Sequence, residues 1–166
     1  MRFFYYLVAL ALPLGGLSAA ETKVNFDLDE SQWELAYEGG VDNFTIVEYV
    51  PKGESLESWT ELISVVSYDG ISESPDKVYH SMIEELKSRC PNSTVESNII
   101  ESQDDSLVAV WTQKEDRMAD ENNWVKIIAQ NNELHTLLVT SKQRKGSGPE
   151  SQVWEKMLKN AKLVSK

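Results

Sequence analysis

Three cations stand close together in an otherwise acidic chain. Lys142, Arg144 and Lys145 precede the glycine-serine-glycine turn around Ser147, and a predicted helix begins just after this turn, at Pro149. Free backbone N–H groups at a helix start, the positive end of the helix dipole and nearby cations together form an anion-binding arrangement. The sequence therefore predicts a site for a small anion or a partner's carboxylate at Lys142, Arg144, Lys145 and Ser147. The alternative is a solvated loop between a strand and a helix.

A second candidate lies in the segment PKGESLESWTELISVVSYDG, residues 51–70. The spacing of Trp59 and Ile63 is compatible with an acidic helix, whereas the alternation from Leu62 to Tyr68 is typical of a strand. The aspartate-glycine pair that follows is a turn signal, which favours the strand. We therefore expect a turn that leads into a strand, with Trp59 and Thr60 at the corner. There they either pack against the sheet or form the rim of a binding groove.

Other kinds of chemistry have little support in the sequence. Zinc sites need several nitrogen or sulfur ligands, and Cys90, His80 and His135 form no close pair along the chain. The acidic loop 115–122 lacks the spacing of a known calcium-binding loop. There is no Gly-x-Ser-x-Gly motif around a candidate nucleophile. We predict no metal site, no cofactor and no catalytic residue, and interpret His135 as a strand residue with a structural role.

The N-terminus has the layout of a secretory signal peptide. One arginine precedes an apolar run, and small residues follow before a cleavage point predicted between Ala20 and Glu21. About 12 apolar residues would span only ~18 Å as a helix, which is short of a bilayer core of ~30 Å. We expect a signal peptide over residues 1–20, a single domain over 21–166, and no membrane span after cleavage. The expected location is the periplasm or the external medium.

Charge and cysteine content limit the partners. Acidic residues number 27 against 16 basic ones, which gives a net charge of −11. Such a chain repels the phosphates of nucleic acids and anionic membranes, whereas a cationic partner is compatible with it. Cys90 is the only cysteine, so no internal disulfide can form. Whether Cys90 pairs with another chain stays open.

Hydrophobic periodicity predicts an α+β fold. A helix should begin at Pro75 behind the N-cap Ser74, and a second helix should begin at Pro149. Apart from the strand that follows Trp59, strands are predicted from their alternating and β-branched residues over the ranges 24–28, 44–50, 94–102, 106–114, 123–130 and 133–141. Short connections between the later strands indicate an antiparallel meander. We expect an antiparallel sheet of about six strands with one helix on each face.

Two resemblances accompany this interpretation. The stretch VEYVPKGESLESWTELISV, residues 47–65, resembles a group of small exported Gram-negative proteins of unassigned function, which share a Pro-x-Gly-Glu step followed by Trp-Thr-Glu. The order of predicted elements is similar to the PsbP-like superfamily, an α/β/α sandwich around an antiparallel sheet. The second resemblance implies accessory and binding functions rather than catalysis.

Together these observations predict an exported, noncatalytic binding or accessory protein of the bacterial envelope. It would act through a protein partner or a small ligand. The alternative is a secreted or periplasmic hydrolase whose site has no recognisable motif. Neither the ligand, the partner nor the oligomeric state can be read from the residues.

Overall fold

A computed structural model describes residues 22–114, 120–142 and 149–165. The predicted signal peptide over residues 1–20 lies outside this part of the chain. So do Arg144, Lys145 and Ser147, three of the four residues of the predicted anion site.

The described residues form nine strands and two helices. In order, the elements are β1 (Thr22–Asn25), β2 (Trp33–Val41), β3 (Phe44–Pro51), β4 (Glu61–Asp69), α1 (Pro75–Arg89), β5 (Thr94–Ser102), β6 (Ser106–Lys114), β7 (Glu121–Gln130), β8 (Glu133–Ser141), α2 (Pro149–Asn160) and β9 (Lys162–Ser165).

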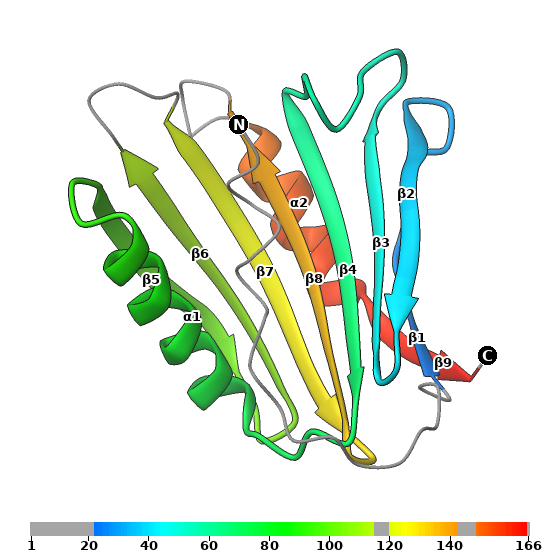
Figure 1. Ribbon diagram of the computed structural model, residues 1–166, viewed down its shortest axis with the longest axis vertical. Helices are drawn as coiled ribbons and strands as arrows, with labels where there is room; N and C mark the ends of the chain where they lie inside the picture. Colours follow the sequence, from blue (N-terminus) through cyan, green and yellow to red (C-terminus); the bar gives the residue numbers. More distant parts are fainter. Residues whose placement is uncertain (1–21, 115–119, 143–148, 166) are drawn as a thin grey trace.

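The strands form two antiparallel sheets (Figure 1). The larger sheet has seven strands in the order β2-β3-β4-β8-β7-β6-β5, and β1 pairs with β9 in a separate two-stranded ribbon. The predicted meander from β5 to β8 is confirmed, and β8 then joins β4 with Val65 opposite Leu137. The prediction of a single sheet of about six strands is wrong, because β2 extends the large sheet and β1 forms a second sheet with β9.

Helix α1 covers part of one face of the large sheet. Ser74 caps its first turn by accepting a hydrogen bond from the Lys77 amide, and Cys90 ends it. The two charged ends of the helix match its dipole, since Asp76 lies in the first turn and Arg89 in the last. Its buried apolar stripe packs on inward-facing strand residues, which include Val66, Leu107, Ala109, Trp111, Val125 and Ile127.

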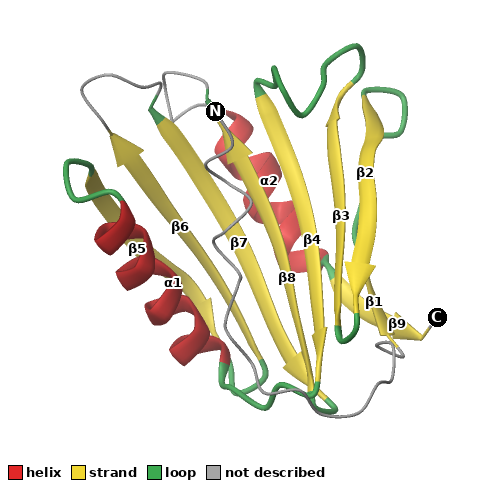
Figure 2. Ribbon diagram, viewed as in Figure 1, coloured by secondary structure: helices red, strands yellow, loops and turns green. Residues whose placement is uncertain are grey.

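Helix α2 covers part of the opposite face (Figure 2). Met157 and Leu158 pack on strand residues that alternate with those under α1, such as Ile63 and Val139. A buried lysine strengthens this contact, because Lys126 Nζ donates hydrogen bonds to the carbonyl oxygens of Lys159 at 3.2 Å and Ala161 at 2.6 Å. A cation at the carboxyl end of α2 also complements the helix dipole.

Neither helix covers a whole face, which is the second departure from the predicted sandwich. Helix α1 packs on β5, β6 and β7, toward one edge of the sheet, whereas α2 lies nearer the middle, where it packs with Ile63 of β4 and Val139 of β8. On the α1 side no described helix lies over β2 and β3, whereas on the opposite side residues of the β1–β9 ribbon pack with Trp33 of β2 and Tyr49 of β3 (Figure 2). Neither helix in the described part of the chain has the length and apolar character needed to cross a bilayer.

Candidate functional site

Three segments that are distant in sequence meet at one end of the large sheet. They are the β3–β4 connection, the start of β7 at Glu121 and the residue after β8, Lys142. The Lys142 amide donates a hydrogen bond of 2.9 Å to the Thr60 carbonyl oxygen, which extends the pairing of β4 with β8. The Lys142 ammonium lies 3.3 Å from the centre of the Trp59 ring, a cation–π contact. We call Trp59, Thr60, Glu121 and Lys142 the corner.

The β3–β4 connection is braced by carboxylates. Glu54 accepts hydrogen bonds from the Thr60 amide at 2.6 Å and from the Thr60 hydroxyl at 2.8 Å. Glu34 of β2 accepts one from the Gly53 amide at 3.0 Å. Gly53 has φ of 83°, a conformation that a residue with a Cβ adopts only under strain. These contacts hold Trp59 in place although its segment forms no regular strand.

The charges of the corner influence one another. Burial raises the pKa of the Glu121 carboxyl to about 7, and the nearby Lys142 ammonium offsets part of this effect. Burial also lowers the pKa of Lys142, whereas the carboxylates of Glu121 and Glu54 act in the opposite direction. Glu121 Oε2 is buried and has no hydrogen-bond partner among the described residues. The corner therefore contains a carboxyl group that changes charge near neutral pH.

This titration predicts a pH-dependent stability. The folded pKa of Glu121 lies above the ordinary value of 4.5, so the folded state binds the proton more tightly than the unfolded state. The contribution of Glu121 to the free energy of unfolding should therefore fall as the pH rises from about 4.5 to about 7, and stay constant above that range. Urea unfolding of wild type and Glu121→Gln across this range measures it.

At low pH the wild type should be at least as stable as Glu121→Gln. As the pH rises, the difference in their free energies of unfolding should shrink and then reverse in favour of the variant. Glu57→Gln is the matched control, since Glu57 is exposed on the same connection. A difference that does not vary with pH for Glu121→Gln would contradict the prediction.

An open depression of about 310 Å³ lies beside the β3–β4 connection. Glu34, Glu54 and Glu57 are among its lining residues, and apolar residues from β2, β3 and the connection complete the lining. These apolar residues are Leu35, Ala36, Val50 and Leu56. Glu54 lines the depression, and its charge also opposes the lowering of the Lys142 pKa by burial. A surface of this kind suits a cation that carries an apolar stem, as a lysine or arginine side chain does.

The structure brings together part of what the sequence singled out. Lys142, predicted as an anion ligand, lies against Trp59 and Thr60, which were predicted separately as a groove rim. The other anion-site residues lie outside the described part, so that site stays a prediction. Sequence reasoning missed the depression, because Glu34 and Leu35 come from a strand that was not predicted. Their only sequence signal was an acidic residue beside an apolar one near Trp33.

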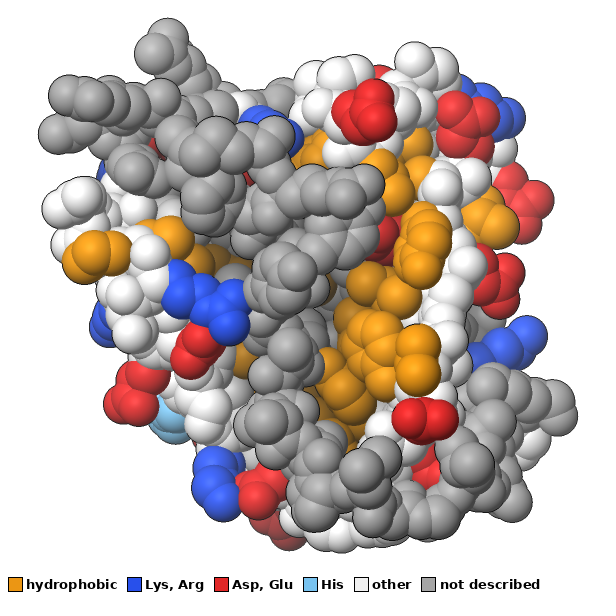
Figure 3. Space-filling model, viewed as in Figure 1, with side chains coloured by type: hydrophobic (Ala, Val, Ile, Leu, Met, Phe, Trp, Pro, Cys, Tyr) orange, Lys and Arg blue, Asp and Glu red, His pale blue; other side chains and the backbone are white. Residues whose placement is uncertain are grey.

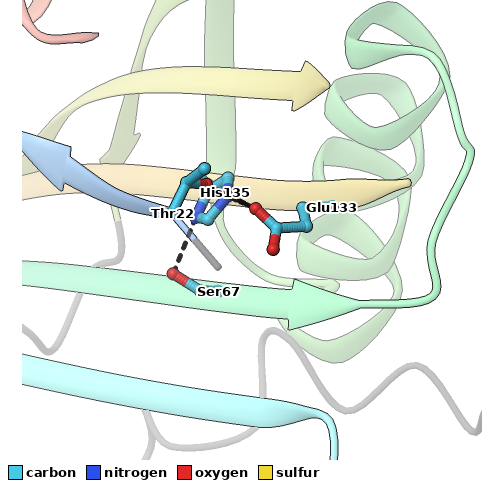
Figure 4. A network of polar contacts seen from close by, with 4 residues as sticks. All are labelled: Thr22, Ser67, Glu133 and His135. Carbon is cyan, nitrogen blue, oxygen red and sulfur yellow. Dashed lines mark hydrogen bonds and ion pairs between the residues drawn. The ribbon is translucent and has the colours of Figure 1, made fainter. Parts of the chain in front are cut away.

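A second polar cluster is buried between the large sheet and β1 (Figure 4). The ring of His135 lies between Ser67 and Glu133, with Nδ1 2.8 Å from Ser67 Oγ and Nε2 3.2 Å from Glu133 Oε2. Thr22 Oγ1 donates a hydrogen bond to Glu133 Oε2 and lies 3.1 Å from His135 Nε2. We call these four residues the buried network. Ser67 and His135 are direct cross-strand partners on β4 and β8.

The order serine, histidine, carboxylate matches the connectivity of a hydrolase triad. A nucleophile must, however, be reachable by substrate, and His135 is 0% and Ser67 7% exposed. Thr22 of β1 lies against the side of the imidazole that faces Glu133 (Figure 4). The network links β1 to β4 and β8 through side-chain contacts, and the structural role of His135 stays a prediction.

No group of three or more histidine, cysteine, aspartate or glutamate side chains is placed to hold a metal ion within the described ranges. Cys90, at the end of α1, is partly buried and is a free thiol.

Comparison with known proteins identifies the fold. A protein-family model matches residues 19–126 of the 166. None of the curated proteins has significant sequence similarity to this chain. Among solved structures, the cyanobacterial PsbP (CyanoP) from Synechocystis sp. PCC 6803 is similar, with a TM-score of 0.55 over 93% of this chain and 99% of that chain, at 10% identity. At so low a sequence identity, the structural similarity shows the fold alone. The similarity confirms the predicted resemblance to the PsbP-like fold.

Proposed function

Because the chain belongs to the uncharacterised family that matches residues 19–126, and because its fold is PsbP-like, we propose a noncatalytic accessory protein that binds a cationic partner. The leader-like N-terminus supports export to the periplasm or the medium. The proposed binding site is the depression lined by Glu34, Glu54 and Glu57.

One observation carries this proposal: the residues that line the depression are apolar ones together with three glutamates. The apolar lining favours the stem of a long basic side chain, and the carboxylates favour its charged head. The chain also carries a net charge of −11, which attracts basic molecules from a distance.

The corner illustrates this type of recognition within the chain. The Lys142 ammonium lies on an aromatic face, and its charge is stabilised by Glu121 and Glu54. The depression offers the same kind of acidic surroundings, Glu54 included, to a cation from outside.

Titration calorimetry with a lysine-rich peptide tests the proposal. Binding should weaken at least about tenfold when the ionic strength rises from about 0.01 M to about 0.15 M, because the Debye length falls from about 30 Å to about 8 Å. Glu57→Lys should weaken binding about fivefold at low salt. Glu57 is the best position for this test, because it is exposed, whereas Glu34 and Glu54 brace the connection.

The matched control is Glu84→Lys, which makes the same change in net charge at an exposed position of α1. Helix α1 packs on β5, β6 and β7, toward the sheet edge opposite to β2 (Figure 1). If both charge reversals weaken binding equally, the attraction comes from net charge and the depression is not the site. Binding that does not change with salt would contradict the electrostatic proposal altogether.

A further inference from the structure

Strand β2 forms one edge of the large sheet in the described part of the chain. Eight of its nine residues pair with β3 along one side, and no described strand follows on its other side. An edge of this kind presents backbone N–H and C=O groups that can pair with another strand. Lysine and proline often block such pairing in natural proteins, and β2 contains neither. A register shift between Leu35 and Tyr37 is the irregularity along this edge.

The side chains of β2 are unusually apolar for a surface strand. Leu35 is 53%, Tyr37 44% and Val41 71% exposed, and the fourth large hydrophobic side chain exposed to this degree among the described residues is Val153 of α2. The Tyr37 ring lies close to Gly39, where a Cβ atom would collide with it. In the space-filling view, hydrophobic side chains form a band beside the β2 margin, and acidic side chains lie along that margin (Figure 3). Concentrated apolar exposure is a property of interaction surfaces.

The charge around β2 favours a basic binding partner at this edge. Glu34 and Glu38 lie on β2 itself, and Glu54 and Glu57 lie on the adjacent connection. A second copy of the chain would bring another net charge of −11 to the same edge, and like charges oppose that association. An extended segment rich in lysine or arginine would instead be attracted.

We propose that β2 binds its partner by strand addition: an extended basic segment of another protein pairs with the free edge of Trp33–Val41. This inference rests on the proposed function and deepens it, because it specifies the shape of the cationic partner. Backbone hydrogen bonds supply affinity in this mode, and alternate side chains supply specificity. One basic side chain of the segment enters the depression, which Glu34, Leu35 and Ala36 line at the start of β2.

A pair of synthetic peptides tests the inference. One is a nine-residue peptide of alternating lysine and valine, and the other has the same sequence with N-methyl groups on alternate amides along its pairing edge. Both carry the same charge and side chains, but the methylated peptide cannot donate the ladder hydrogen bonds. We expect it to bind at least about tenfold more weakly. Hydrogen exchange should slow at the β2 amides with the first peptide and not with the second.

Two exposed valines provide a matched pair of variants. Val41→Ser removes apolar surface from β2, and Val153→Ser makes the same change on α2. Val41 lies at the opposite end of β2 from the residues that line the depression, so its replacement leaves the proposed cation site intact. We expect the first variant to weaken binding about threefold to fivefold and the second to leave it unchanged.

The outcomes separate the two proposals. Equal binding of both peptides, still weakened by Glu57→Lys, would overturn strand addition and leave the cationic partner intact. Failure of both peptides to bind would overturn both proposals. Sedimentation that finds a dimer of the free protein, lost in Val41→Ser and kept in Val153→Ser, would overturn the basic segment as the occupant of β2.

Discussion

Replacing His135 by leucine is expected to lower the free energy of unfolding by about 3–5 kcal/mol. The imidazole is fully buried and contacts both Ser67 and Glu133, whose side chain is also buried. Leucine has a similar bulk but no polar atom, so the carboxyl and the hydroxyl lose a partner inside the protein. Removing one member of a buried polar pair leaves the other desolvated, which costs more than the net value of the pair. Urea unfolding at neutral pH measures the loss.

The control is the same substitution at the other histidine. His80 is exposed on α1, and His80→Leu should change the free energy of unfolding by no more than about 0.5 kcal/mol. The double variant Glu133→Gln with His135→Leu should recover part of the stability, because it leaves no ionisable group of the pair in the core. A loss below about 1 kcal/mol for His135→Leu would show that the buried network does not hold β1 to the sheet.

Replacing Trp111 by alanine should be about as damaging, with an expected loss of about 3–5 kcal/mol. The Trp111 side chain is 2% exposed and packs beneath α1, with its ring 6.5 Å from that of Tyr79. Truncation removes most of this contact and leaves a cavity between helix and sheet. Because α1 depends on this face of the sheet for burial, the midpoint temperature of thermal unfolding, followed by far-ultraviolet circular dichroism, should fall as well.

Trp59→Ala is the informative comparison, because the same side chain is removed from the corner. Trp59 is only partly buried, and its contact with the Lys142 ammonium contributes about 0.5–1 kcal/mol. We expect a loss of less than about 1.5 kcal/mol there. Equal losses for the two tryptophans would mean that Trp59 belongs to the core, and the corner would no longer be a candidate rim.

The sequence predicted the elements whose signals are local. The cap at Ser74, the proline that follows it and the apolar stripe of α1 all lie within one short segment, and the helix begins where expected. The same holds for β5 to β8, which are joined by short turns and pair with their neighbours along the chain.

What the sequence did not reveal depends on partners far along the chain. Strand β2 carries Gly39, Gly40 and two glutamates, which individually disfavour strands, and only its pairing with β3 makes it one. Strand β9 has four residues and exists through its pairing with β1. The depression depends on β2, and the buried network depends on β1, which pairs with β9, so neither site could be predicted from local patterns.

The corner occupies an intermediate position. Trp59, Thr60 and Lys142 were recognised separately, because aromatic and basic residues near turns are visible in any sequence. Their proximity follows from the pairing of β4 with β8, which places Glu61 opposite Ser141. That pairing brings together residues about 80 positions apart, and no periodicity in the sequence indicates it.

The pairing of β1 with β9 has a consequence for the order in which the protein folds. Thr22, at the start of β1, pairs with Ser165, at the end of β9, so the first described strand to be synthesised waits for the last. During that interval β1 has no partner strand to hold it, and Thr22 is not yet held over Glu133 and His135. A domain generally folds as one unit. Closing Thr22 over His135 therefore requires strand β9 as well as strand β1, so the burial of this histidine depends on residues from both ends of the described part of the chain.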